Sequence, residues 1–303
     1  MAAPENTLAQ DADAVETSAF ASAGPWPIPK ERLTGLDMDQ QQVRRIAQKI
    51  FEANRRRERF RPLRASDAPE SMEAAYRIQD EVHRLFEVEG GQGPLGGHKI
   101  ALTSRAVQEL CGVDRPAYGA VFASVIRRSP AVLKAADFMH LGLEFELAVQ
   151  IGRNVPVSGA PYDRVTIAPF VEACMPAFEL IEDRHADYGD LDAESILTDR
   201  CWCAGVVLGA PVAGWRQVGL ATTPVELVWN GQVVDRGVAG DSMGHPLDGL
   251  AWIANHLAAR GRSMTEDEIV ITGSALKTRF PELGDEVTYR IAGLGETTVR
   301  LEA

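Results

Sequence analysis

Apolar residues near position 45 recur at helical spacing. The steps between the five of them are three, one, three and one residue, which places them on one face of a helix. Pro62 cannot continue that helix, so the helix must end ahead of it. A second helix is predicted over residues 68–89, where apolar side chains again share one side and a Gly-Gly-Gln-Gly-Pro run follows. The residues of the first stripe are Val43, Ile46, Ala47, Ile50 and Phe51.

After residue 94 the pattern changes to short β-like runs separated by Gly and Pro. Asn230-Gly231 predicts a tight hairpin turn, and Gly293-Leu294-Gly295 predicts another before a last strand. A helix over residues 247–260, ended by Gly261, interrupts the strands. The predicted strands cover residues 143–151, 225–229, 269–272, 287–291 and 297–301.

These elements predict an α+β protein with a helical segment over residues 38–95 and a β-rich body over residues 96–303. No linker divides the body into independent domains. Residues 1–37 are rich in Ala, Ser, Pro and acidic side chains, so we expect a disordered leader there. The leader lacks the basic and apolar regions of a secretory signal, which favours a cytoplasmic protein.

Charge excludes several classes of partner. The 303 residues include 31 basic and 43 acidic ones, a formal net charge of −12, which repels nucleic acid and anionic membrane surfaces. The arginine-rich run at residues 55–61 is therefore interpreted as a solvated helix end, or as a contact with a neighbouring subunit. No run of about 18 apolar residues predicts a membrane span, and four cysteines do not make a disulfide scaffold.

Two acidic residues share one face of a predicted strand. Residues 143–151 alternate strictly, so Glu144 and Glu146 project side by side while apolar side chains point the other way. A half-exposed strand with an acidic outer face would give the same pattern. Glu179 lies inside a separate apolar run, Ala177-Phe178-Glu179-Leu180-Ile181, where an isolated carboxylate is costly unless it is paired or bound to a cation.

Three converging carboxylates would form a site for a hard divalent cation. Oxygen ligands favour Mg²⁺ or Mn²⁺ over zinc, so Glu144, Glu146 and Glu179 are the candidate ligands. Lys99 lies between glycines and apolar residues and is either a structural partner of a carboxylate or an acid–base group. Cys201 and Cys203 are interpreted as core residues, and the absence of a glycine-rich phosphate loop disfavours a nucleotide cofactor.

Several short stretches together resemble the fumarylacetoacetate hydrolase superfamily, in its branch of 2-keto-4-pentenoate hydratases and 4-oxalocrotonate decarboxylases. The resemblance covers residues 39–303, and the order of the stretches makes chance an improbable source. Those stretches are Glu73-Ala74-Ala75-Tyr76-Arg77-Ile78-Gln79, Gly97-His98-Lys99-Ile100-Ala101-Leu102-Thr103-Ser104, Gly112-Val113-Asp114-Arg115-Pro116-Ala117-Tyr118-Gly119, Leu143-Glu144-Phe145-Glu146, Phe178-Glu179-Leu180-Ile181-Glu182-Asp183-Arg184, Gly244-His245-Pro246-Leu247 and Ile271-Thr272-Gly273-Ser274.

The resemblance implies a mixed β-roll body that binds one Mg²⁺ or Mn²⁺ through Glu144, Glu146 and Glu179, with Lys99 as the general acid–base. It implies a small 2-oxo acid or its dienol as substrate, and a homo-oligomer that can associate with a companion enzyme. The candidate substrate-binding residues are Arg184, Asp199, Arg200, Ser274 and Lys277.

One departure from the branch bears on the reaction. The hydratases carry an acidic residue where this chain has Ala117. This difference favours decarboxylation over hydration. From the resemblance as a whole we expect a metal-dependent lyase of aromatic-compound catabolism, similar to the hydratases. The alternatives are a 2-oxo-3-enedioate decarboxylase, then an acylpyruvate-type hydrolase, or a non-catalytic partner subunit of such an enzyme.

Overall fold

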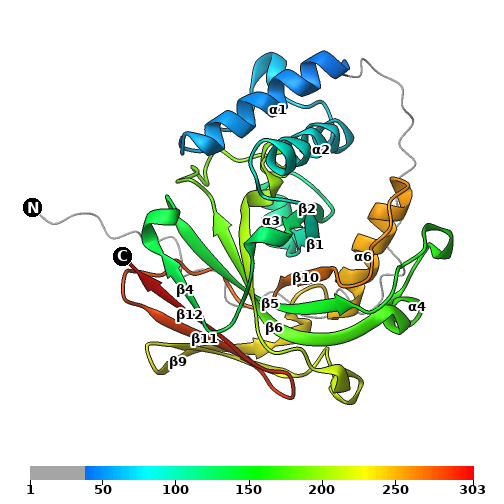
Figure 1. Ribbon diagram of the computed structural model, residues 1–303, viewed down its shortest axis with the longest axis vertical. Coiled ribbons are helices and arrows are strands. Elements are labelled where there is room, and N and C mark those ends of the chain that lie inside the picture. Colours follow the sequence, from blue (N-terminus) through cyan, green and yellow to red (C-terminus); the bar gives the residue numbers. More distant parts are fainter. Residues whose placement is uncertain (1–37) are drawn as a thin grey trace, which may run out of the picture.

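Two helices form the N-terminal layer of the protein. The computed structural model describes residues 38–303, so the predicted leader over residues 1–37 lies outside the described residues. Helix α1 covers Gln40–Arg55 and helix α2 covers Met72–Val88, and the two pack against each other at the upper end of the molecule (Figure 1). The five residues of the predicted α1 stripe are all buried, which confirms that prediction.

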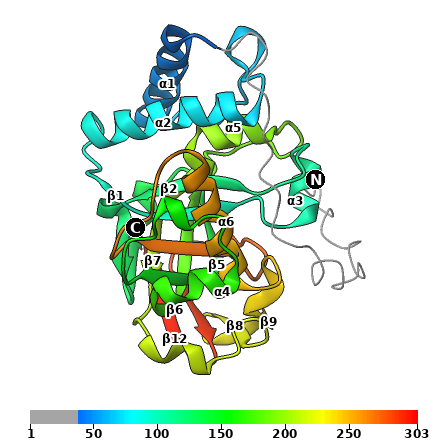
Figure 2. The ribbon, with the colours of Figure 1, turned by 90° about the vertical axis from the view of Figure 1, so that its right-hand side faces the viewer.

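Hydrogen bonds from backbone amides to capping side chains explain where the two helices begin. The Asp39 side chain accepts a hydrogen bond from the Gln42 amide, and the Ser71 side chain accepts one from the Ala74 amide. Each satisfies a donor that the first helical turn leaves free. Four further helices follow, and α5 lies beside α2 (Figure 2). They are α3 Arg105–Leu110, α4 Arg164–Ile167, α5 Ala193–Thr198 and α6 Pro246–Ala259.

The body contains two mixed sheets, which agrees with the predicted α+β class. The larger has the order β2-β1-β10-β5-β6-β7-β3 and the smaller has the order β4-β12-β11-β8-β9. The strands of the larger are β1 Leu95–Ala101, β2 Ala117–Phe122, β3 Ile126–Arg128, β5 Leu141–Ile151, β6 Val171–Glu182, β7 Cys203–Leu208 and β10 Ile269–Ser274. Those of the smaller are β4 Ala131–Lys134, β8 Pro224–Trp229, β9 Gln232–Val238, β11 Glu286–Ile291 and β12 Gly295–Glu302.

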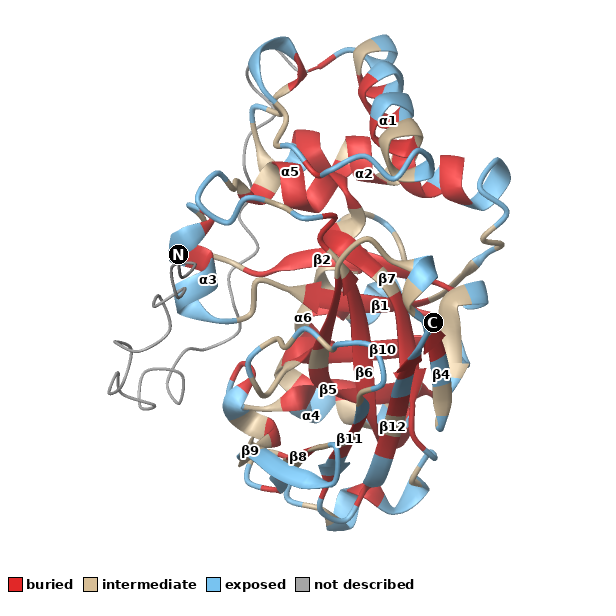
Figure 3. Cartoon of the chain, turned by 90° about the vertical axis from the view of Figure 1, so that its left-hand side faces the viewer, coloured by how far each residue is buried: buried red, intermediate tan, exposed pale blue. Residues whose placement is uncertain are grey.

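The main core lies between the two sheets. Phe145 of β5 has its ring centroid 5.8 Å from that of Phe178 on β6 and 5.7 Å from that of Tyr289 on β11. Apolar residues of β5 fill this space because every second side chain points to the same face. Figure 3 shows the strands buried along much of their length, whereas α1 is buried on one side and exposed on the other.

The turns follow the predicted chemistry. Asn230 and Gly231 have φ angles of 50° and 78°, and they connect β8 to β9 as a hairpin. Residues 293–295 connect β11 to β12, and Gly261 follows α6 with a φ of 70°. The predicted hairpins and the end of the late helix are therefore confirmed.

The arginine run after α1 is a solvated helix end. The side chains of Arg55 and Arg56 are 60% and 68% exposed and lie near Glu52. Arg57 donates to the Ala136 carbonyl, and Arg59 donates to the His185 carbonyl. Within residues 38–303, no helix is both long and apolar enough to cross a membrane.

Candidate functional site

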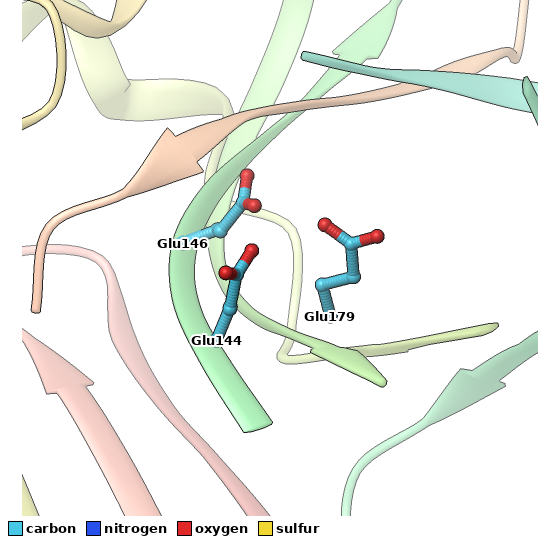
Figure 4. Close-up of side chains that lie close together, drawn as sticks. All are labelled: Glu144, Glu146 and Glu179. Atoms are coloured by element: carbon cyan, nitrogen blue, oxygen red, sulfur yellow. The ribbon is translucent and has the colours of Figure 1, made fainter. Parts of the chain in front are cut away.

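Three carboxylates converge on one face of the larger sheet. Glu144 and Glu146 project from β5, and Glu179 projects from β6 directly opposite Glu144. One oxygen from each carboxylate lies within 4.8 Å of the other two. Figure 4 shows the three carboxylates turned toward one another from the two strands. The two separate acidic signals in the sequence thus meet because β5 and β6 pair in this register.

Glu144, Glu146 and Glu179 are called the triad from here on. Their burial decides between the two interpretations of the alternating strand. Glu146 and Glu179 are fully buried, and Glu144 is half-buried. Ala148, the next residue on the acidic face, is also fully buried. The alternative of a half-exposed strand with a solvated acidic face is therefore wrong, because the acidic face of β5 is buried along most of its length, as the apolar face is.

Neighbouring groups hold two of the carboxylates in place. The Gly273 amide donates to Glu146 Oε2 at 2.6 Å, and the Thr278 hydroxyl donates to Glu144 Oε1 at 2.9 Å. Gly273 has a φ of +99°, and a Cβ at this position would lie 2.2 Å from the Ser242 hydroxyl oxygen. Only glycine therefore presents this amide to Glu146 without strain or a clash.

Lys99 of β1 completes the group. Its Nζ donates to Glu179 Oε1 at 2.5 Å and to the Cys201 carbonyl at 3.0 Å. The lysine stem passes over Gly119 of β2, where a Cβ would lie 2.8 Å from Lys99 Cγ. Glycine at 119 thus leaves the space through which the lysine reaches the carboxylates.

The charges of this group are poorly balanced. Burial raises the pKa of Glu146 well above its usual range, and the carboxylates of Glu179 and Glu144 raise it further. Burial also raises the pKa of Glu179 to about 7, although Lys99 opposes that shift. Burial alone would lower the pKa of Lys99, but Glu179 outweighs it, so the pKa of Lys99 is raised and the amine keeps its proton.

The triad fits a divalent cation. Glu146 Oε1 and Glu179 Oε2 are buried and have no hydrogen-bond partner among residues 38–303, although a buried polar atom normally has one. Both oxygens belong to the group of three carboxylates whose ligand atoms already lie close together. All the donors are hard oxygens, the type that Mg²⁺, Mn²⁺ and Ca²⁺ prefer. Lys99 supplies a proton-bearing group next to the same carboxylates.

Arg184 and Asp199, two predicted substrate-binding residues, contact each other. Their side chains form a buried ion pair, and Arg184 also donates to the Glu58 carbonyl at 2.8 Å. Asp199 accepts a further bond from the Asn54 amide of α1 at 2.7 Å. This network ties the helical layer to the loop after β6, and a contact with substrate stays a prediction.

The other three predicted substrate-binding residues have different surroundings. Arg200 is half-buried, with its guanidinium carbon 3.8 Å from the centroid of the Phe86 ring, and it donates to Asn54 Oδ1 at 3.3 Å. Ser274 accepts from the Phe145 amide and donates to the Leu276 carbonyl, both at 2.8 Å. Lys277 is exposed. Their roles in substrate binding stay predictions.

Several groups at the site are not identifiable from residue type. Gly119, Gly273 and the Cys201 carbonyl act through backbone geometry, which residue type alone does not indicate. Both glycines do lie inside the short stretches that carry the family resemblance, and this was the available signal. Thr278 gave no signal, because a single threonine after a strand is common. His245 lies in another of these stretches, and its Nδ1 accepts a hydrogen bond from the Leu247 amide at the start of α6.

Comparisons with known proteins agree with this site and fold. The fumarylacetoacetate hydrolase C-terminal family matches residues 107–302. A 2-hydroxyhexa-2,4-dienoate hydratase from Comamonas testosteroni is 27% identical over 264 residues, which cover 86% of this chain and 98% of that protein. A 4-oxalocrotonate decarboxylase from Pseudomonas putida is 30% identical over 236 residues, with coverages of 78% and 88%.

A solved structure extends the similarity to three dimensions. It is a 4-oxalocrotonate decarboxylase from Pseudomonas putida G7, complexed with magnesium and adipate, at 26% identity and a TM-score of 0.80. The similarity covers 88% of this chain and 100% of that one. A family match over more than half of the chain, together with relatives that align along most of their own length, establishes that this chain belongs to the fumarylacetoacetate hydrolase family.

Proposed function

We propose that this chain is a divalent-metal-dependent lyase of 2-oxo acids or their dienols, similar to the 2-keto-4-pentenoate hydratases, in aromatic-compound catabolism. The observation that carries the proposal is the convergence of Glu144, Glu146 and Glu179 beside Lys99. The relatives named above are a hydratase and decarboxylases, which belong to one class of enzyme, the lyases.

The three glutamates would hold the metal, and Mg²⁺ or Mn²⁺ suits their oxygen ligands. A cation bound there supplies Lewis-acid stabilisation of negative charge that develops on the 2-oxygen of the substrate. The Gly273 amide and the Thr278 hydroxyl fix the orientation of Glu146 and Glu144, so these carboxylates need little rearrangement to bind the metal.

Lys99 would transfer a proton between its amine and a carbon of the substrate. Its Nζ carries the proton in the buried pair with Glu179, and the Cys201 carbonyl fixes the direction of the amine. From this position the amine can donate a proton to a substrate carbon and take one back, which is general acid–base catalysis. Burial of Lys99 excludes bulk water, so the proton goes to a bound molecule and not to solvent.

Decarboxylation is the second candidate reaction, and Ala117 favours it. Ala117 is fully buried at the start of β2, two residues from Gly119, which pairs with Lys99. Alternate residues of a strand share a face, so an acidic side chain at 117 would project beside Lys99. Alanine at position 117 offers no carboxylate to orient a water molecule for addition.

The wider setting follows from the same proposal. We expect a homo-oligomer in the cytoplasm that takes a small 2-oxo acid and can associate with a companion enzyme of its pathway. The exposed arginine run after α1 offers one surface for such contacts. Sedimentation of the full chain, alone and mixed with a pathway enzyme, would measure both kinds of association.

Turnover by the purified chain tests the proposed function. The Mg²⁺-loaded protein is given 2-hydroxypenta-2,4-dienoate and 2-oxohex-3-enedioate, and dienol consumption and CO₂ release are followed separately. Hydration consumes the first substrate without CO₂, whereas decarboxylation releases CO₂ from the second. Turnover that chelation abolishes and Mg²⁺ or Mn²⁺ restores supports the lyase, while inactivity on both substrates favours the non-catalytic partner subunit.

The Ala117→Asp variant separates the two reactions. If the missing acid limits hydration, the variant gains hydratase activity relative to decarboxylation. An unchanged ratio of the two activities would mean that Ala117 does not select the reaction. Serine in place of the same residue, Ala117→Ser, controls for added size without a charge.

A further inference from the structure

A second group of polar and aromatic side chains follows the three glutamates along β5 and β6. Glu144 pairs with Glu179, Gly142 pairs with Ile181, and Leu141 pairs with Glu182. His140 directly precedes β5, and Asp183 directly follows β6. Gly142 alternates with Glu144 and therefore lies on the face of the triad, where it contacts Phe280. His140 stacks on the same Phe280 ring, so it lies next along that face. His140 lies four residues before Glu144, a separation of about 13 Å along an extended strand.

Asp183 fixes the orientation of His140. The Asp183 side chain is fully buried, and its Oδ1 lies 2.8 Å from His140 Nδ1. A carboxylate accepts hydrogen bonds, so Nδ1 is the donor in this pair. Asp183 also accepts from the Tyr188 hydroxyl at 3.0 Å and from the His185 amide at 2.9 Å. Three donors therefore share the charge of Asp183.

Two rings hold the imidazole from both sides. The His140 ring stacks on Phe280 with centroids 4.4 Å apart, and on His185 with centroids 4.8 Å apart. Phe280 also covers Gly142, where a Cβ would lie 3.2 Å from its Cε1 atom. The same segment carries Thr278, which bonds Glu144. The imidazole is therefore connected to the triad by Phe280 and Thr278.

Exposure shows from which side a ligand reaches the triad. Glu146 and Glu179 are fully buried, so solvent contacts the triad at half-buried Glu144. The His140 side chain is 37% exposed, and within residues 38–303 no group hydrogen-bonds its Nε2. Burial raises the pKa of Tyr188, and the charges of Asp183 and Glu144 raise it further, so this cluster lies within the field of Glu144.

We propose that His140, oriented by Asp183 and held between Phe280 and His185, binds the far carboxylate of a dicarboxylic 2-oxo acid. This inference rests on the proposed function, because the triad must hold the 2-oxo acid end of the substrate. That end occupies the buried side, so the rest of the substrate extends past Glu144 toward His140. An imidazolium donates from both nitrogens, so Nε2 serves the far carboxylate while Nδ1 serves Asp183.

Binding of two unreactive probes to the Mg²⁺-loaded protein tests the proposal. 2-Oxoadipate and 2-oxohexanoate share the 2-oxo acid end and differ in the far carboxylate. Calorimetry should give at least tenfold tighter binding of 2-oxoadipate by the wild-type chain. If neither probe binds, the proposed function fails; if both bind equally, the proposed function stands and the role of His140 is wrong.

Two isosteric variants separate binding from a structural role. The amide of His140→Asn takes the place of Nδ1 and keeps the Asp183 contact, whereas the amide of His140→Gln takes the place of Nε2. We expect the preference for 2-oxoadipate to disappear in His140→Asn and to persist in part in His140→Gln. The reverse order would show that His140 only satisfies Asp183. Loss of the preference in Lys277→Gln, with both His140 variants unaffected, would also overturn the proposal.

Discussion

Lys99 Nζ donates to Glu179 Oε1 across 2.5 Å, and the two side chains are 2% and 0% exposed. A buried ammonium and a buried carboxylate compensate each other, and neither is tolerated alone in such a place. The carboxylates of Glu144 and Glu146 lie close by and form no ion pair with any side chain of the part of the chain that the structure describes. The site therefore combines one internal ion pair with an excess of negative charge, and the predictions below follow from that arrangement.

Replacing Lys99 by methionine should separate proton transfer from metal binding. Lys99→Met keeps much of the volume but removes the ammonium, so kcat should fall by about 10²–10⁴-fold, as for loss of a general acid–base. Affinity for Mg²⁺ should not weaken, because Glu179 loses the cation that competes with the metal. Steady-state kinetics and Mg²⁺ titration calorimetry measure the two effects. A kcat within threefold of wild type would exclude Lys99 as the acid–base group.

Removing one ligand charge should weaken metal binding. In wild type, Mg²⁺ should raise the melting temperature, because only the folded chain brings the three carboxylates together. Glu144→Gln and Glu179→Gln should each reduce this rise, with at least tenfold weaker Mg²⁺ binding. Glu172→Gln, at an exposed position on the same strand as Glu179, is the matched control. A full Mg²⁺-induced rise in both ligand variants would refute the three-glutamate site.

The metal-free protein should lose stability as pH rises from about 4.5 to about 7. The folded state raises the pKa of Glu179 to about 7 and that of Glu146 well above its usual range. The folded state therefore holds protons that the unfolded state releases, and the free energy of unfolding falls across this interval. Urea unfolding with a chelator present measures it.

A variant of Glu146 separates its contribution to this loss of stability from that of the other titrating groups. Glu146→Gln removes one of the two carboxylates with a raised pKa, so its free energy of unfolding should fall less between pH 5 and pH 7 than that of wild type. Mg²⁺ should stabilise wild type more at pH 8 than at pH 6, because protons compete with the metal for the same oxygens. Parallel pH curves for the two proteins would contradict the assignment.

Alanine at position 119 should displace the lysine. The added Cβ would lie 2.8 Å from Lys99 Cγ and 3.2 Å from the Arg200 carbonyl oxygen, so the stem of Lys99 must shift. We expect Gly119→Ala to lower kcat tenfold or more and to change the affinity for Mg²⁺ much less. Gly214→Ala is the control, because beyond its two chain neighbours no atom of the described residues lies within 4 Å of the added Cβ and its φ is not in the left-handed region. Equal kcat values for the two variants would disprove the close approach.

Local patterns along the chain predict the helices, the strands and the residue types that can do chemistry. Helical spacing identified the buried face of α1, and Asn230-Gly231 identified the β8–β9 hairpin, because both are local properties of the chain. Alternation along β5 placed Glu144 and Glu146 on one face, and the cost of an isolated buried carboxylate singled out Glu179. The order of the short motifs indicated the family.

The way in which these residues meet depends on the pairing of strands that are distant in sequence. The register of β5 against β6 sets Glu179 opposite Glu144, and the pairing of β1 with β2 lets Lys99 pass over Gly119. Contacts between residues far apart in sequence depend on which strands pair, and residue type alone does not encode this. The pairing of Arg184 with Asp199, and the position of His140 beside Asp183, likewise depend on loops that the body of the protein brings together.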